Sequence, residues 1–128
     1  MMFSDQAAVA MLNGPDTVRD SVLVSVTFEE PGIDALPIVT MIFAAGHGRT
    51  PRTIKLIFRD VAEFGFLYEA GKPRDVAMFK CLQTPDGDFY VSLDPYDESD
   101  RSPSEEDGDF VRAKNLEASI GVPMKPLA

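Results

Sequence analysis

Residues 76–94 read VAMFKCLQTPDGDFYVSLD, two apolar runs joined by a turn signal. Within the turn, Pro85 presets the backbone for the first central position of a type I turn, and Gly87 accepts the left-handed conformation that follows it. Short apolar runs on both sides of such a turn are typical of a β-hairpin. The pattern predicts strands over 76–82 and 88–93, and with them an antiparallel sheet.

Three stretches nearer the N-terminus also have the character of strands. Residues 22–28 and 54–59 alternate between two faces with a period of two, as a half-buried strand does. Residues 38–45 are apolar on both faces. This third stretch is therefore either central in a two-layer structure, or one of its faces meets another subunit.

Residues 60–69 fit two patterns. Asp60 and Glu63 resemble a capping box, which favours a helix. Phe64 and Phe66 belong to an alternating series, and Gly65 weakens a helix. We favour a bulged or second strand here, and a helix would instead give an α+β fold.

The N-terminal residues 5–12 are predicted to form a short helix. Ser4 or Asp5 can cap it, because a side-chain oxygen at that position accepts hydrogen bonds from the first free backbone amides. Residues three and four positions apart would form an apolar face that covers one side of a sheet. That face consists of Ala8, Met11 and Leu12.

A last strand is predicted from Phe110 to about Leu116 or Ile120, and residues 121–128 are predicted to be a loose C-terminal tail. About six strands and one short helix indicate a mainly β chain. We expect an antiparallel β-sandwich or a strongly curved sheet, with an α+β fold as the alternative. A length of 128 residues is typical of a single domain, here residues 1–128.

The acidic residues are concentrated in one segment. The chain has a formal net charge of −9, and residues 94–109, the acidic loop, hold eight acids and only one base, Arg101. The rest of the chain is almost neutral. Such a segment repels nucleic acid and anionic membranes and attracts cations or a basic protein. We therefore expect neither nucleic acid nor a membrane as a partner.

The acidic loop can be interpreted in two functional ways. Carboxylates near the end of a strand are plausible ligands for calcium or another divalent metal, although the spacing fails the EF-hand template. The predicted metal ligands are Asp94, Asp97, Glu98 and Asp100. The predicted contacts to a basic partner are Glu105, Glu106, Asp107 and Asp109. The alternative without a function is a solvated loop rich in serine and proline.

No motif predicts catalysis or a bound cofactor. His47 is the only histidine and Cys81 the only cysteine, and no third group is available to orient them as a catalytic pair. The glycines around His47 lack the remainder of a dinucleotide fingerprint or a P-loop. Cys81 lies in a predicted strand, where a small buried hydrophobe is expected. We expect no catalytic residue and no cofactor.

The sequence favours a cytoplasmic location. Its N-terminus lacks the basic and long apolar regions of a secretory signal, and the longest apolar run is much shorter than a membrane-spanning helix. A single cysteine cannot form a disulfide within the chain. These features are typical of a protein in a reducing compartment.

One segment resembles known proteins. Residues 89–114 contain FYVSLDPYDESD and, after a short acidic spacer, DGDFVRAK. This combination resembles a segment of a family of small bacterial proteins of unknown function. The resemblance covers about a fifth of the chain and implies a bacterial origin.

Three hypotheses about function follow. The first is a non-catalytic binding protein, in its sharpest form an immunity-type inhibitor whose acidic loop contacts a basic partner. The second is a metal-binding module or metal-dependent hydrolase that uses the acidic loop. The third is a structural homo-oligomer, for example a homodimer, that associates through Ile38–Ala45.

Overall fold

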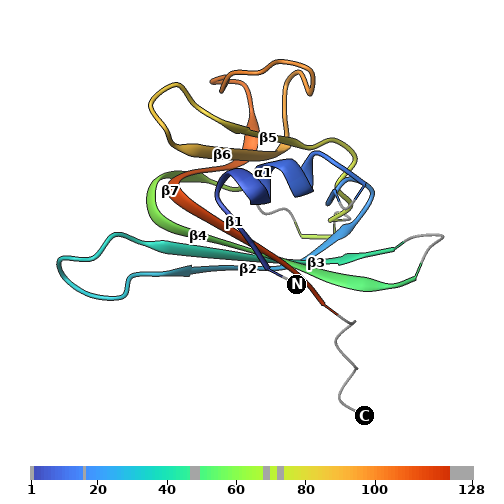
Figure 1. The fold of residues 1–128 in the computed structure, drawn as a ribbon, viewed down its shortest axis with the longest axis horizontal. Coiled ribbons are helices and arrows are strands. Elements are labelled where there is room, and N and C mark those ends of the chain that lie inside the picture. Colours follow the sequence, from blue (N-terminus) through green and yellow to red (C-terminus); the bar gives the residue numbers. More distant parts are fainter. Residues whose placement is uncertain (1, 16, 47–49, 68–69, 72–73, 122–128) are drawn as a thin grey trace, which may run out of the picture.

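A computed structural model describes residues 2–121 except 16, 47–49, 68–69 and 72–73. Within the described residues the chain forms seven strands and one short helix (Figure 1). In chain order they are β1 (Met2–Ser4), α1 (Gln6–Leu12), β2 (Val22–Glu29), β3 (Ile38–Ala45), β4 (Arg52–Gly65), β5 (Lys80–Gln83), β6 (Phe89–Asp94) and β7 (Gly108–Gly121). His47 and residues 122–128 of the predicted tail lie outside the described part, and Gly121 is the last residue of β7.

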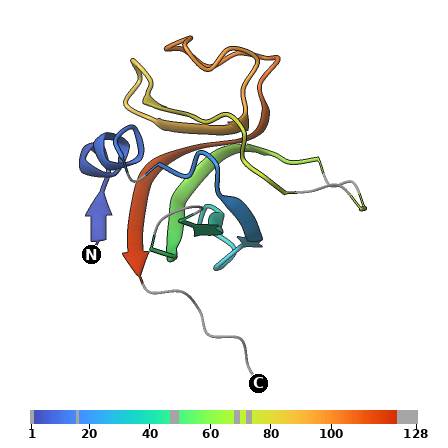
Figure 2. The same ribbon diagram turned by 90° about the vertical axis from the view of Figure 1, so that its right-hand side faces the viewer.

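All strand pairs are antiparallel, and the order across the sheet is β2-β3-β4-β7-β6-β5. Along one edge β7 pairs with β4, and along the other it pairs with β6 near its start and with β1 near its end. Figure 2 shows β4 and β7 bending strongly, so that the β5–β6 hairpin lies over the other half of the sheet. The fold is thus an open, strongly curved antiparallel sheet, which confirms the predicted mainly β class.

The bend in β4 includes a bulge. The pairing of β4 with β7 changes register between Val61 and Glu63, and Asp60 has a left-handed φ of 56°. A bulge adds a residue to one strand and increases its local twist and bend. Residues 60–65 are therefore a bulged continuation of a strand, as favoured from the sequence, and the α+β alternative is wrong.

The core lies between the two halves of the folded sheet. It is built from large apolar side chains that are completely buried, among them Phe43, Phe58 and Leu116. Burying a side chain of this size stabilises the fold by roughly 1.5–3 kcal/mol. The predicted apolar face of α1 is confirmed, because Ala8 and Leu12 are fully buried and Met11 almost fully.

The doubly apolar stretch Ile38–Ala45 is a central strand. As β3 it pairs with β2 on one side and β4 on the other, and alternate side chains, such as Met41, point into the core. The side chains between them, such as Ile42, are mostly half-buried. Both backbone edges of β3 are occupied, so self-association through this strand would have to use its outer face.

The hairpin prediction is confirmed at its turn and corrected at its start. Gly87 has a φ of 89°, and the Thr84 amide donates to the carbonyl of Asp88 at 2.7 Å. The predicted strand over 76–82 was too long, because the ladder with β6 begins only at Lys80. Val76 instead donates its amide to the carbonyl of Ser21 at 2.8 Å, just before β2.

Asp5 does not cap the helix as expected. It precedes α1, but its side chain makes no capping hydrogen bond. Its Oδ1 accepts from the backbone amide of Leu116 at 3.0 Å instead, which joins the start of α1 to β7. In the described part of the chain no helix has the length and apolar character that crossing a membrane requires.

Candidate binding site

The acidic loop connects β6 to β7 and is held in place by Asp107. The Oδ2 atom of Asp107 accepts from the Nζ of Lys80 at 2.9 Å and from the hydroxyl of Tyr90 at 2.7 Å. Two backbone amides complete the arrangement, from Tyr96 to Oδ1 at 2.9 Å and from Ser104 to Oδ2 at 3.0 Å. The loop is therefore built around one buried carboxylate.

Lys80 and Asp107 form a buried ion pair in which both side chains are 0% exposed. Burial alone would raise the pKa of Asp107, but its hydrogen bonds outweigh this effect, and its pKa lies below the usual range. Burial, together with the neighbouring Asp107, raises the pKa of Tyr90. Asp107 is thus a charged structural anchor inside the protein, and its carboxylate is buried, unlike the exposed side chains of Glu105 and Glu106.

The predicted metal ligands beyond the strand end have other contacts. Asp97 and Asp100 each accept hydrogen bonds from the serine two residues later. Glu98 forms an ion pair with Arg19 at 2.8 Å and accepts from the amide of Phe79 at 2.8 Å. Among the described residues, no three His, Cys, Asp or Glu side chains gather so that they could hold a metal ion. The structure therefore does not bring the predicted ligands together as a metal site.

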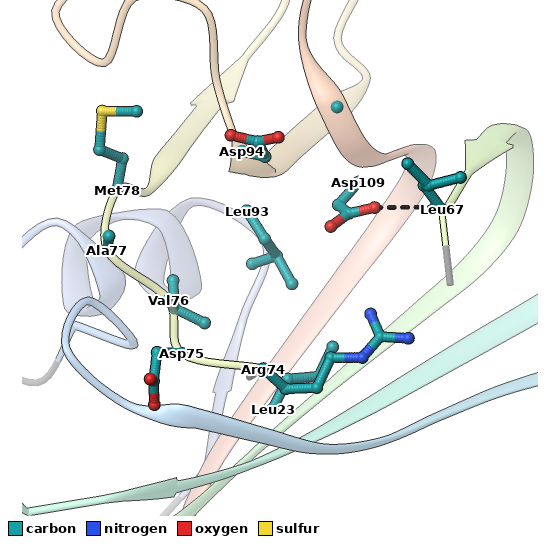
Figure 3. A pocket seen from close by; sticks show the side chains of 11 residues that line it. Leu23, Leu67, Arg74, Asp75, Val76, Ala77, Met78, Leu93, Asp94 and Asp109 are labelled. Carbon is teal, nitrogen blue, oxygen red and sulfur yellow. Dashed lines mark hydrogen bonds between the residues drawn. The ribbon is translucent and has the colours of Figure 1, made fainter. Parts of the chain in front are cut away.

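The first and last acids of the loop instead border an open hollow of about 340 Å³ (Figure 3). It lies between the start of β2, the segment before β5, and the adjoining ends of β6 and β7. Its lining, which defines the hollow below, consists of Leu23, Leu67, Arg74, Asp75, Val76, Ala77, Met78, Leu93, Asp94, Gly108 and Asp109.

The hollow combines an apolar floor with charged walls. Leu23, Val76 and Leu93 are buried and provide the floor. Its charged lining consists of the carboxylates of Asp75, Asp94 and Asp109 and the guanidinium of Arg74. Figure 3 shows Leu93 between Asp94, Asp109 and the backbone of residues 74–76. A recess with apolar walls and a few charged groups is the usual form of a ligand or side-chain pocket.

The two carboxylates are positioned by local backbone features. Asp109 has a left-handed φ of 46°, and its Oδ1 accepts from the amide of Leu67 at 3.0 Å. Asp94 pairs with Gly108 in the β6–β7 ladder. A Cβ added at Gly108 would lie only 3.1 Å from the Oδ2 of Asp94. Aspartate adopts a left-handed backbone more readily than most residues, because its short polar side chain can form local hydrogen bonds.

The structure regroups the acids that the sequence singled out. Asp94 was predicted as a metal ligand and Asp109 as a partner contact, yet they line the same hollow. Glu105 and Glu106 are exposed on the loop and free of the buried network around Asp107. The signal in the sequence was that Asp94 directly follows one predicted strand and Asp109 directly precedes the next. The apolar floor gave no signal, because its residues are far apart in the chain.

Cys81 has the environment of a structural residue. Its side chain is buried, and burial raises the pKa of the thiol to about 12, despite the opposing effect of Arg101. The thiol is therefore protonated at neutral pH, and a thiolate nucleophile is not available there.

No family model, curated protein or solved structure matches this chain. The resemblance of residues 89–114 to small bacterial proteins stays a prediction.

Proposed function

We propose that this protein is a non-catalytic binding protein, and that a basic, partly apolar segment of a partner protein docks in the hollow. One observation carries the proposal: Asp94 and Asp109 stand over a buried apolar floor in an open recess. A lysine or arginine side chain has an apolar stem and a cationic end, so it can contact both the floor and the carboxylates.

The acidic loop would favour the encounter with such a partner. Asp97, Glu105 and Glu106 are exposed, and dense like charge accelerates association with an oppositely charged surface. The buried pair of Lys80 and Asp107 holds the loop in one arrangement before binding. A preorganised surface loses less conformational freedom when the complex forms.

The finer form of this proposal is an immunity-type inhibitor in the bacterial cytoplasm. Such an inhibitor covers the basic surface of a harmful partner and needs no catalytic group. The charge of the loop and the resemblance of residues 89–114 support this form.

The test uses a fluorescently labelled peptide of alternating lysine and valine, about eight residues long. We expect its fluorescence anisotropy to rise with protein concentration, and the affinity to fall as NaCl increases from about 50 to about 300 mM. The double variant Asp94→Asn and Asp109→Asn should bind the peptide at least about tenfold more weakly. Asparagine tolerates the left-handed backbone at position 109, so the fold should persist.

The matched control is the double variant Asp34→Asn and Asp86→Asn. It makes the same change in net charge at two exposed residues that do not line the hollow. Its affinity should stay within about twofold of the original protein, because a remote exposed charge is largely screened. Equal weakening by both double variants would show that only net charge matters, and the proposed site would be wrong.

A further inference from the structure

We infer that the partner segment binds as an additional β-strand along the open edge of β2, at residues 24–29, and places a side chain in the hollow. This inference rests on the proposed function and specifies the conformation of the partner. An extended chain that joins a sheet edge gains affinity from main-chain hydrogen bonds and specificity from pockets for its side chains.

The first step concerns the edge of the sheet. β2 is the terminal strand of the sheet, and within the described part of the chain only its first residues are covered on the outer side. There the amide of Leu23 donates to the carbonyl of Arg74 at 2.9 Å, and Val76 bonds to Ser21. Among the described residues no segment forms backbone hydrogen bonds with the outer edge of residues 24–29. Such an edge is a template for an incoming strand.

The second step concerns the side chains along this edge. Val24 is 54% exposed and Phe28 is 47% exposed, although both are apolar. The ring of Phe28 lies 5.5 Å from that of Phe64, which lies 4.9 Å from that of Phe66. Exposed apolar groups on a sheet edge are characteristic of interaction surfaces. An added strand would cover them.

The third step connects the edge to the hollow. Residues 74–76 lie along the beginning of β2 and also line the hollow with Leu23. In Figure 3, β2 passes beside Arg74 and Leu23 at the border of the hollow. A strand that pairs with residues 24–29 would lie in line with residues 74–76, so one of its ends would arrive at the hollow.

Charge decides between a partner and a second copy of this chain. Glu29 and Glu30 lie exposed at one end of the open edge, and at the other end Asp20 and Asp75 lie beside Arg19 and Arg74. Each copy of the chain has a net charge of −9, so two copies repel each other overall. A basic segment is attracted by the same acids.

The experiment uses the full chain and two versions of the lysine–valine peptide, one unmodified and one methylated on every backbone nitrogen. Methylation removes the amide donors and keeps the charges and side chains. We expect the methylated peptide to bind at least about tenfold more weakly. The unmodified peptide should also slow hydrogen exchange about tenfold or more at those amides of residues 24–29 that do not bond to β3.

Three outcomes would overturn the inference. If both peptides bind equally and only the variant with Asp94→Asn and Asp109→Asn weakens them, strand addition is wrong and the proposed function stands. If neither peptide shows salt-dependent binding, both are wrong. If sedimentation shows a dimer in which these amides are protected without peptide, the edge belongs to a second copy of the chain.

Discussion

At the residue scale, the decisive contact is the one between Lys80 and Asp107. A lysine flanked by Phe79 and Cys81 enters an apolar region, and its charge is stable there only with a partner. The sequence therefore contained a signal that Lys80 needs an acid. It could not show which of the eight acids in the loop this would be, because that choice depends on how the loop folds back over β5 and β6.

Replacing Asp107 should destabilise the protein strongly. Asp107→Ala leaves Lys80 and Tyr90 buried without their partner, and breaking a buried pair in this way costs about 3–5 kcal/mol. Asp97→Ala is the control, because Asp97 is an exposed acid of the same loop and should change the free energy of unfolding by about 1 kcal/mol or less. Urea denaturation measures both values. Equal losses would contradict the anchoring role of Asp107.

The lowered pKa of Asp107 also predicts how stability depends on pH. Because the folded-state pKa lies below the unfolded value near 3.8, the carboxylate stabilises the fold above that pH and loses its contribution as the pH falls toward the folded pKa. The difference in unfolding free energy between the original protein and Asp107→Asn should be constant from about pH 7 to about pH 5. It should already be smaller at about pH 3. A difference unchanged at the lower pH would show that the pKa of Asp107 is not lowered in the fold.

At the element scale, the sequence predicted those strands and turns that a local pattern within one segment indicates. Alternation over 22–28 and the turn at Gly87 are local patterns, so β2 and the β5–β6 turn were predicted correctly. β1 has only three residues, too few for a period to be visible. Residues 76–79 leave the hairpin because Val76 pairs beside β2, a long-range choice. The hollow likewise depends on several elements, and of its lining only Asp94 and Asp109 were recognised from the sequence.

The packing of β4 against β7 can be tested at Gly65. A Cβ at this position would lie 2.8 Å from the ring of Phe110, which stacks on Tyr90 with ring centroids 5.9 Å apart. We expect Gly65→Ala to lower the free energy of unfolding by about 1–3 kcal/mol, because the ring must shift. Gly32→Ala is the matched control, since a Cβ there meets nothing within 4 Å, and it should be neutral or slightly stabilising. Chemical denaturation that gave the same value for both would refute this packing constraint.

At the scale of the whole molecule, the fold separates an almost neutral body from an acidic loop. Figure 1 shows this loop beyond the β5–β6 hairpin, on the side away from β2 and β3. The loop keeps acids such as Glu105 and Glu106 close together and exposed, which costs stability through their mutual repulsion. Asp107 is the exception, because its charge is balanced by Lys80. A protein that only needed to fold would gain from removing the exposed acids, so their presence fits a role in binding.

This repulsion predicts a specific response to salt. Screening should raise the melting temperature of the protein by a few degrees between about 10 mM and about 0.5 M NaCl. The double variant Glu105→Lys and Glu106→Lys should be more stable at low salt and gain less from added salt. Glu30→Lys with Asp34→Lys makes the same change in net charge outside the loop and should keep most of the salt response. If the melting temperatures of the two double variants responded identically to salt, the repulsion would come from the net charge of the whole protein. The acids of the loop would then not form a distinct region of negative potential, and the loop would have no special role in steering a basic partner.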